Sequence, residues 1–262
     1  MTLIIAEAGI NHNGDLATAY KLIEAAKAAG ADVVKFQTYD AEKLDPPGPR
    51  RDMLQRFEIS RGTTAGLKIH ADALGIEFLS TPFDVDSLKF LVNLGVKRIK
   101  IASGHLDNWP LLRAAGATGL PVLLSSGMAT WGQVAAASRE MALEKLTVMH
   151  CVSTYPCRVE DANLMALRSV SYDVGYSDHT TSLILPAAAV AMGATVIEKH
   201  LTLDSRMEGP DHSASLEPNY FRIMVENIRE VEKALGSGMK QPQACEAEAM
   251  KIADERRRWR AG

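Results

Sequence analysis

Apolar residues along the chain follow two alternating patterns, short continuous runs and longer segments with helical spacing. The short runs are rich in Ile, Val and Leu. Consecutive apolar positions are typical of parallel strands that are buried on both faces. On this basis eight strands are predicted: Leu3–Ala8, Val33–Thr38, Glu77–Thr81, Arg98–Ala102, Val122–Ser125, Thr147–Val152, Asp173–Tyr176 and Thr195–His200.

The longer segments repeat apolar residues every three or four positions, and most of them stop at a glycine. The first lies between a capping Asp15 and Gly30. Seven more helices are predicted: Thr64–Leu74, Asp84–Leu94, Trp109–Ala117, Trp131–Leu143, Asn163–Ser169, Leu183–Met192 and Pro218–Leu235. Eight strands that are each followed by a helix predict an α/β fold, a single-domain (β/α)8 TIM barrel over residues 1–262. A doubly wound open sheet is the alternative, but it does not require eight evenly spaced units.

Two segments lie outside this alternation. Residues 41–62 contain three prolines and a glycine at positions 46–49, and they are predicted to form a long loop after the second strand. Residues 237–262 are predicted to form a C-terminal tail of the barrel domain.

The charge of the chain is nearly balanced. There are 29 Lys and Arg residues against 32 Asp and Glu residues, so the net charge of −3 offers no field that would hold a nucleic-acid backbone. The one dense basic run, the arginines between positions 256 and 260, is interpreted as a solvated helix end. We therefore expect small-molecule partners and no nucleic acid.

Cysteine usage and the absence of targeting signals favour a cytoplasmic location. The three cysteines, Cys151, Cys157 and Cys245, contain no C-x-x-C pair. The N-terminus lacks the basic region of a signal peptide. The most apolar later stretch has about 12 residues, which is too short to cross a bilayer, so no membrane association is expected.

Two lysines interrupt buried strands, Lys35 in the second and Lys100 in the fourth. A buried ammonium group needs an anionic partner. One interpretation is a structural ion pair with Glu7 or Glu198. The other, which we favour, is a site for a phosphorylated or carboxylated ligand at the C-terminal end of the barrel. Hydroxyl groups at the same rim would direct that ligand: Thr81, Ser103 and Ser125. A further interpretation is that one of these lysines forms a Schiff base with a carbonyl substrate.

Two histidines, His179 and His200, end adjacent predicted strands. Carboxylates are expected near them: Glu7, Asp178, Glu198 and Asp211. Two imidazoles with oxygen ligands suit a divalent metal such as Mn, Fe, Co or Zn. The other histidines at strand ends are interpreted as core residues: His12, His150 and His212. Because neighbouring residues of a strand point to opposite faces, His150 and Cys151 are not expected to act as a nucleophile pair.

Nine motifs occur in an order that resembles the sialic acid synthase family, the N-acetylneuraminate synthases and their relatives. They are Ile5–Gly14, Val34–Thr38, Ser80–Phe83, Lys100–Gly104, Ser125–Met128, His150–Cys151 with Tyr155–Pro156, Gly175–Thr180, Glu198–Asp204 and Gly209–Leu216. Together they extend over nearly the whole chain. The resemblance implies a (β/α)8 barrel that condenses phosphoenolpyruvate with an aldose, giving a sialic-acid-like 2-keto-3-deoxy acid and phosphate. This route activates no carbonyl through an amine, which removes the Schiff-base reading.

The resemblance also implies roles for individual residues. A divalent metal, Mn first with Mg, Co or Zn as alternatives, is expected at His179 and His200. The expected catalytic residues are Glu7, Lys35, Lys100, His105 and Asp211. The expected substrate-binding residues are Gln37, Thr81, Ser103, Ser125, Ser153, Tyr155, Ser177 and Glu198.

The sequence departs from the family pattern in three respects. His105 stands where the family has Glu, and Ser153 stands where it has Asn. The sequence also ends where the family's linker to a small antifreeze-like domain would begin. We therefore expect phosphoenolpyruvate and metal binding to survive better than recognition of an N-acetylated sugar. A homodimer and a separate capping partner are further expectations.

Two other functions remain open for the same pocket. One is a non-catalytic or regulatory barrel that binds a phosphorylated metabolite, suggested by His105 and the missing cap. The other is a metal-dependent aldolase or lyase, which would take pyruvate as its donor.

Overall fold

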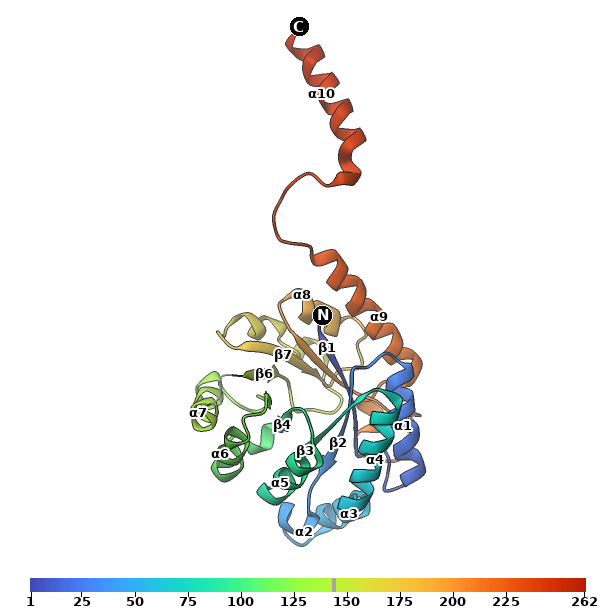
Figure 1. Cartoon of the computed structure of the whole chain (residues 1–262), viewed down its shortest axis with the longest axis vertical. Helices are drawn as coiled ribbons and strands as arrows, with labels where there is room; N and C mark the ends of the chain where they lie inside the picture. Colours follow the sequence, from blue (N-terminus) through green and yellow to red (C-terminus); the bar gives the residue numbers. More distant parts are fainter. Residues whose placement is uncertain (143–144) are drawn as a thin grey trace. The chain divides into compact units, whose positions relative to one another are not determined.

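The computed structural model describes residues 1–142 and 145–262, which form two units, Met1–Glu232 and Lys233–Gly262. In the first unit, eight parallel strands are surrounded by helices (Figure 1). The strands are β1 (Leu3–Gly9), β2 (Val33–Thr38), β3 (Glu77–Pro82), β4 (Ile99–Ile101), β5 (Val122–Ser125), β6 (Leu146–His150), β7 (Asp173–Asp178) and β8 (Val196–His200). The predicted eight-stranded α/β barrel is confirmed.

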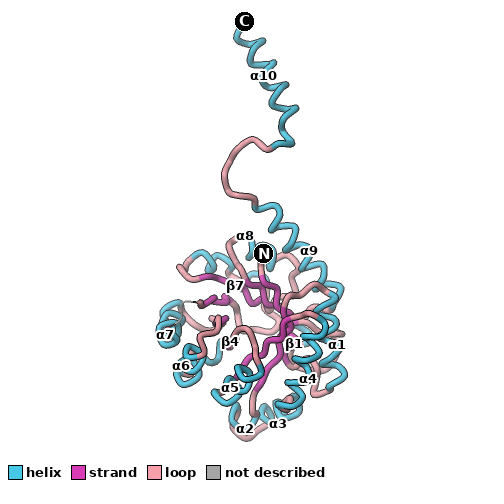
Figure 2. The backbone as a smooth tube through the Cα atoms, viewed as in Figure 1, coloured by secondary structure: helices cyan, strands magenta, loops and turns pink. Residues whose placement is uncertain are grey.

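Hydrogen-bonded ladders join the strands in the order β3-β2-β1-β8-β7-β6-β5-β4. The end strands β3 and β4 also lie next to each other, which nearly closes the sheet into a barrel. Figure 2 shows the strands, in magenta, grouped inside the ring of helices.

The helices of the first unit follow the predicted alternation with two exceptions. They are α1 (Leu16–Ala28), α2 (Ala41–Leu44), α3 (Pro49–Phe57), α4 (Arg61–Leu74), α5 (Val85–Leu94), α6 (Trp109–Ala117), α7 (Trp131–Met141), α8 (Leu185–Ala191) and α9 (Pro218–Leu235), whose last residues pass into the second unit. The predicted end of the fifth helix at Leu143 lies outside the described residues.

The prediction of a long loop over residues 41–62 was wrong, because α2 and α3 both lie there. Asp40 caps α2 by accepting a hydrogen bond from the Glu42 amide. Pro49 occupies the first turn of α3, where its missing N–H is not needed, and Gly48 before it has a φ of 154°. The cluster of prolines and glycine therefore marks the start of a helix.

The predicted helix Asn163–Ser169 was also wrong. The connection between β6 and β7 contains only two 3-10 segments, Val159–Asp161 and Leu164–Arg168. Only Leu167 of the second segment is buried. A segment this short with a single buried side chain lacks the apolar stripe that stabilises an α-helix through packing.

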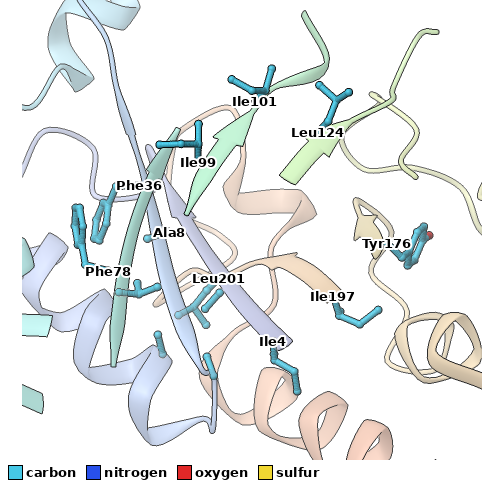
Figure 3. Packing of buried hydrophobic residues seen from close by; sticks show 14 of the residues in the cluster. Ile4, Ala8, Phe36, Phe78, Ile99, Ile101, Leu124, Tyr176, Ile197 and Leu201 are labelled. Atoms are coloured by element: carbon cyan, nitrogen blue, oxygen red, sulfur yellow. The ribbon is translucent and has the colours of Figure 1, made fainter. Parts of the chain in front are cut away.

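Both faces of each strand are buried, but they face different layers of the core. Ile5 and its counterparts on other strands form an inner cluster with Val33, Leu79, Leu123, Met149 and Val196. Ile4 and Ile197 belong to the outer cluster between strands and helices, where the rings of Phe36 and Phe78 also stack (Figure 3). Two residues further along the strands, toward their C-terminal ends, the inner face carries polar side chains such as Glu7 and Lys35. The apolar cluster therefore forms the floor on which a polar site rests.

The second unit, Lys233–Gly262, contains a short 3-10 turn and α10 (Ala247–Ala261) within the segment predicted as a tail. No residue of α10 is buried. Among the described residues, no helix is both long and apolar enough to cross a membrane.

A glycine at the contact between α6 and α7 offers a test of the packing. A Cβ atom added at Gly116 would lie 2.2 Å from the backbone oxygen of Met141. We expect Gly116→Ala to lower the free energy of unfolding by about 1–3 kcal/mol because the two helices must move apart. The melting temperature should fall by about 2–4 °C for each kcal/mol, measured by circular dichroism.

Gly132 in α7 is the matched control. A Cβ atom added there meets only the Thr130 hydroxyl oxygen, at 3.8 Å. Gly132→Ala should raise stability slightly, because alanine favours a helix over glycine by about 0.5–1 kcal/mol. Equal melting temperatures for the two variants would contradict the close packing of α6 against α7.

Candidate active site

One cavity of about 600 Å³ opens at the C-terminal ends of the strands. All of the predicted site residues line it: Glu7, Lys35, Gln37, Thr81, Lys100, Ser103, His105, Ser125, Ser153, Tyr155, Ser177, His179, Glu198, His200 and Asp211. They come from every strand of the barrel or from the segment that follows it. The structure therefore brings the whole predicted set to one place.

The two lysines lie deep in the cavity and contact carboxylates. Lys35 Nζ lies 3.0 Å from Glu7 Oε2 and 3.3 Å from Glu198 Oε2. Lys100 Nζ lies 3.5 Å from Glu198 Oε1 and donates to Ser125 Oγ at 2.7 Å. The ion pairs that formed one interpretation of the lysines are present. Because the same ammonium groups line the cavity, the interpretation as an anion site remains compatible with them.

Burial and the lysines give the two glutamates different properties. Burial raises the pKa of Glu7 to about 7, although nearby Lys35 opposes this shift. Burial acts in the same direction on Glu198, but Lys100 and Lys35 outweigh it and lower its pKa to about 2. Glu198 is therefore a fixed negative charge, whereas Glu7 gains and loses a proton near neutral pH.

The imidazoles of His179 and His200 lie edge to face in the cavity wall, with ring centroids 5.6 Å apart. His179 Nδ1 donates to the Val152 carbonyl at 2.6 Å, so the lone pair of the neutral ring is on Nε2, which lies 3.4 Å from Ser177 Oγ. His200 Nδ1 is buried without a hydrogen-bond partner among the described residues. Burial lowers the pKa of both histidines, so both rings are neutral at physiological pH.

These donors fit a divalent cation with an open coordination sphere. Asp211 Oδ2 lies 3.8 Å from His200 Nδ1, and burial raises the pKa of this carboxyl to about 6. Within residues 1–142 and 145–262, no three His, Cys, Asp or Glu side chains form a metal cluster. The protein therefore offers two neutral imidazoles, and the other positions would be filled by water, by substrate or by a shifted carboxylate.

Asp178 lies close enough to His179 to act on it electrostatically, but its carboxylate does not share the cavity with the imidazoles. Asp178 is absent from the cavity wall and instead contacts Lys199 at 2.5 Å. The cause is the alternation of a strand, in which Ser177 faces the cavity and the next residue faces the helices.

The segments that follow β4, β5 and β6 come close together around Gly127. The Gly127 amide donates to Ser103 Oγ at 3.0 Å. A Cβ atom at Gly127 would lie 2.1 Å from Ser153 Oγ and 2.8 Å from Ser103 Oγ. Only glycine leaves room for both hydroxyls here, and both serines line the cavity.

The remaining predicted residues occupy the side walls. The Tyr155 ring lies against His179, with centroids 4.2 Å apart. Gln37 Nε2 donates to Glu7 Oε1 at 3.4 Å. His105 packs edge-on against Phe83, and burial lowers its pKa, which keeps it neutral.

The histidines interpreted as core residues lie outside the cavity. His150 Nε2 bonds the Ala162 carbonyl oxygen at 2.9 Å, and His212 Nδ1 bonds Thr202 Oγ1 at 2.7 Å. His12 Nδ1 accepts from the Gly14 amide. Cys151 faces the cavity while His150 faces away, so the separation of these two neighbours is confirmed.

α2 and α3 contribute a wall of the cavity that the sequence pattern did not predict. Leu44, Asp45, Arg50, Met53 and Leu54 all line the cavity. Arg50 Nε pairs with Asp45 Oδ2 at 2.9 Å. The position of this segment in the sequence could have indicated the wall. A long segment that follows a barrel strand lies on the face where barrel enzymes bind substrate.

The fold and this cavity define the class, a (β/α)8 barrel whose C-terminal mouth is lined by lysines, histidines and carboxylates. Residues 22–240 match the model of the NeuB family. An N,N'-diacetyllegionaminic acid synthase of Legionella pneumophila is 42% identical, over 91% of this chain and 74% of that protein. An N-acetylneuraminate-9-phosphate synthase of Mus musculus is 36% identical, over 93% and 74%.

A solved structure agrees with these relatives. The sialic acid synthetase of Leptospira borgpetersenii, in complex with citrate, is 37% identical with a TM-score of 0.92, over 98% of this chain and 93% of that one. The chain belongs to the NeuB family and is, like its named relatives, a synthase.

The raised pKa of Glu7 predicts how stability depends on pH. The unfolded carboxyl has its ordinary pKa of 4.5 and the folded one about 7, so stability falls as pH rises through this window. The Gln side chain of Glu7→Gln resembles protonated Glu7, so the stability of this variant does not fall over the same pH range. The melting temperature of the variant minus that of the wild type should therefore increase from about pH 5 to about pH 8.

Glu42→Gln, at an exposed position, is the control for this comparison. A difference between Glu7→Gln and wild type that stays constant or shrinks with rising pH would show that Glu7 is ionised throughout.

Proposed function

We propose that this synthase condenses phosphoenolpyruvate with an aldose, releasing phosphate and forming a sialic-acid-like 2-keto-3-deoxy acid, and that it requires a divalent metal. The observation that carries the proposal is the convergence of two buried ammonium groups and two neutral imidazoles on one cavity. Relatives named as synthases of N,N'-diacetyllegionaminic acid, N-acetylneuraminate-9-phosphate and pseudaminic acid, together with a spore coat polysaccharide biosynthesis protein, support the same reaction class.

The lysine end of the cavity suits phosphoenolpyruvate. Lys35 and Lys100 supply positive charge, and Lys35 also donates to Thr81 Oγ1 at 3.1 Å. Serine and threonine hydroxyls supply directed donors, and the buried surroundings strengthen each contact. We assign the phosphate and carboxylate of the donor to this end.

The imidazole end suits the aldehyde of the sugar. A divalent ion held by His179 and His200 would supply Lewis-acid polarisation of the aldehyde oxygen; Mn is the first choice, with Mg, Co or Zn as alternatives. Gln37 and Asp211 also line the cavity and would hold sugar hydroxyls. The wall from α2 and α3 would face the remainder of the aldose, which we expect to be N-acylated.

The proposed reaction forms a carbon–carbon bond from C3 of phosphoenolpyruvate to the aldehyde carbon. Water adds at C2, and the resulting tetrahedral intermediate expels phosphate. The aldehyde oxygen gains one proton and the water loses one. Glu7, whose pKa lies near neutrality, is suited to give or take a proton. Neutral His105, whose Nδ1 accepts from Asn108 Nδ2 at 3.1 Å, would offer its Nε2–H as a donor. The expected homodimer and separate capping partner stay predictions.

The primary test is phosphate release from phosphoenolpyruvate with Mn²⁺ and a panel of aldoses, together with the product mass. We expect turnover with at least one N-acylated aldose, and we expect His179→Ala to lower kcat about 100-fold or more, because the aldehyde is no longer activated. Circular dichroism of the variant controls for folding.

Other outcomes would select the alternative functions. Calorimetric binding of phosphoenolpyruvate without turnover on the whole panel would indicate a binding barrel. Turnover with pyruvate in place of phosphoenolpyruvate would indicate an aldolase.

Lys100→Met tests the anion end separately. Removing the charge while keeping the length of the side chain should raise the KM for phosphoenolpyruvate about tenfold or more, since hydrogen bonds to charged groups contribute about 1.5–3 kcal/mol. Lys97→Met, at an exposed position three residues earlier, should leave KM unchanged. Equal KM values for the two variants would argue against phosphate or carboxylate binding at Lys100.

A further inference from the structure

A second buried ion pair lies outside the cavity, between Asp178 and Lys199. Both side chains are fully buried, and Lys199 Nζ lies 2.5 Å from Asp178 Oδ2. Lys199 also donates to the carbonyl of Thr180. Asp178 Oδ1 accepts from the Tyr176 hydroxyl at 3.0 Å and from the Thr180 amide at 2.9 Å. Every charged atom of the pair therefore has a defined partner.

The pair is placed symmetrically with respect to the two imidazoles. Asp178 and Lys199 are register partners on β7 and β8, and each directly precedes one of the histidines, His179 or His200. The preceding register pair faces the cavity, where Ser177 Oγ donates to Glu198 Oε1 at 2.9 Å. Cross-strand pairs thus alternate between the cavity and the helix side, and the ion pair lies one step before both imidazoles.

The contacts of Lys199 link the two histidine-bearing segments directly. Its ammonium group binds the residue before His179 through a carboxylate and the residue after it through a carbonyl. One side chain from β8 therefore fixes the backbone on both sides of a histidine that follows β7. The register between β7 and β8 ends at Asp178 and Lys199, so the ion pair lies at the last step at which these two strands are paired.

Stability alone does not account for such a pair. Taking two charges out of water is costly, and well-packed apolar residues of similar volume often serve stability as well or better. What the ion pair adds is direction, because an ammonium group and a carboxylate must meet at one distance and angle. This directionality matters for the distance between His179 and His200.

We propose that Asp178 and Lys199 are positioning residues that set the separation and orientation of the two imidazoles for a divalent cation. This inference rests on the metal site of the proposed function. Neither side chain lines the cavity, so the pair acts on the histidines from the outer side of the strands. The lysines that we assign to phosphoenolpyruvate belong to other strands and do not contact the pair.

The test replaces both charges at once, so that no unpaired charge is left in the core. Asn at position 178 keeps acceptors for Tyr176 and Thr180, and Met at position 199 keeps the length of the side chain. We expect Asp178→Asn/Lys199→Met to fold and to bind Mn²⁺ about tenfold or more weakly, measured by electron paramagnetic resonance of free Mn²⁺ without substrate. Its affinity for phosphoenolpyruvate, measured by calorimetry without metal, should be unchanged.

A matched control removes an ion pair from the opposite end of the barrel. Arg98 Nε lies 2.6 Å from Glu77 Oε1 where β3 and β4 begin. Glu77→Gln/Arg98→Met should lower the melting temperature and leave Mn²⁺ affinity unchanged. Should the first double variant not fold, Tyr176→Phe removes only the hydroxyl that donates to Asp178, and we expect it to weaken Mn²⁺ binding about two- to fivefold.

The outcomes separate this inference from the proposed function. A folded Asp178→Asn/Lys199→Met, or in its place Tyr176→Phe, that binds Mn²⁺ as tightly as wild type would overturn the positioning role and leave the synthase proposal intact. Equal weakening in the Glu77→Gln/Arg98→Met control would show a general structural effect and would also overturn it. A wild-type protein that binds no Mn²⁺ would remove the metal from the proposed function, and this inference with it.

Discussion

Two ammonium groups at the mouth of the barrel stay charged only because two carboxylates are buried beside them. Lys35 and Lys100 share Glu198, and Lys35 also contacts Glu7. An isolated charge in this environment would be neutralised or would destabilise the fold. The rest of the site depends on this balance, because it keeps positive charge available in a place that water reaches poorly. An anionic substrate can then enter without first creating its own site.

The same ion pairs give the acidic and basic groups of the cavity different protonation properties. Glu198 lies between the two lysines and keeps its charge, while Glu7 shares only one of them and titrates near neutral pH. His179 and His200 are neutral because burial disfavours their charged forms. One cavity thus contains two buried ammonium groups, a proton carrier and two neutral imidazoles. These are the groups that an enol phosphate, a proton transfer and a divalent ion respectively require.

The barrel supplies this arrangement through the alternation of its strands. The inner face of each strand changes from apolar to polar within two residues, as from Ile5 to Glu7 and from Leu123 to Ser125. The apolar cluster below excludes water, and the polar ring above lines the cavity. The outer face of the same strands is used differently: most of it packs against helices, and at the ends of β7 and β8 it carries the Asp178–Lys199 pair.

The sequence by itself determined the strands, the barrel and the residues that line its mouth. Continuous apolar runs and their helical partners identify the elements, and polar residues at strand ends must gather because all parallel strands end on the same side. Only the tertiary structure decided which charged side chains pair with each other. Lys35 with Glu7 and Glu198 is a contact between strands distant in sequence, and Asp178 turned away from the imidazoles because of the pleat. Residues 41–44 and 49–57 are helical because Ala41, Leu54 and Phe57 pack in one apolar cluster, and Pro49 stands at a first helical position, where proline is tolerated.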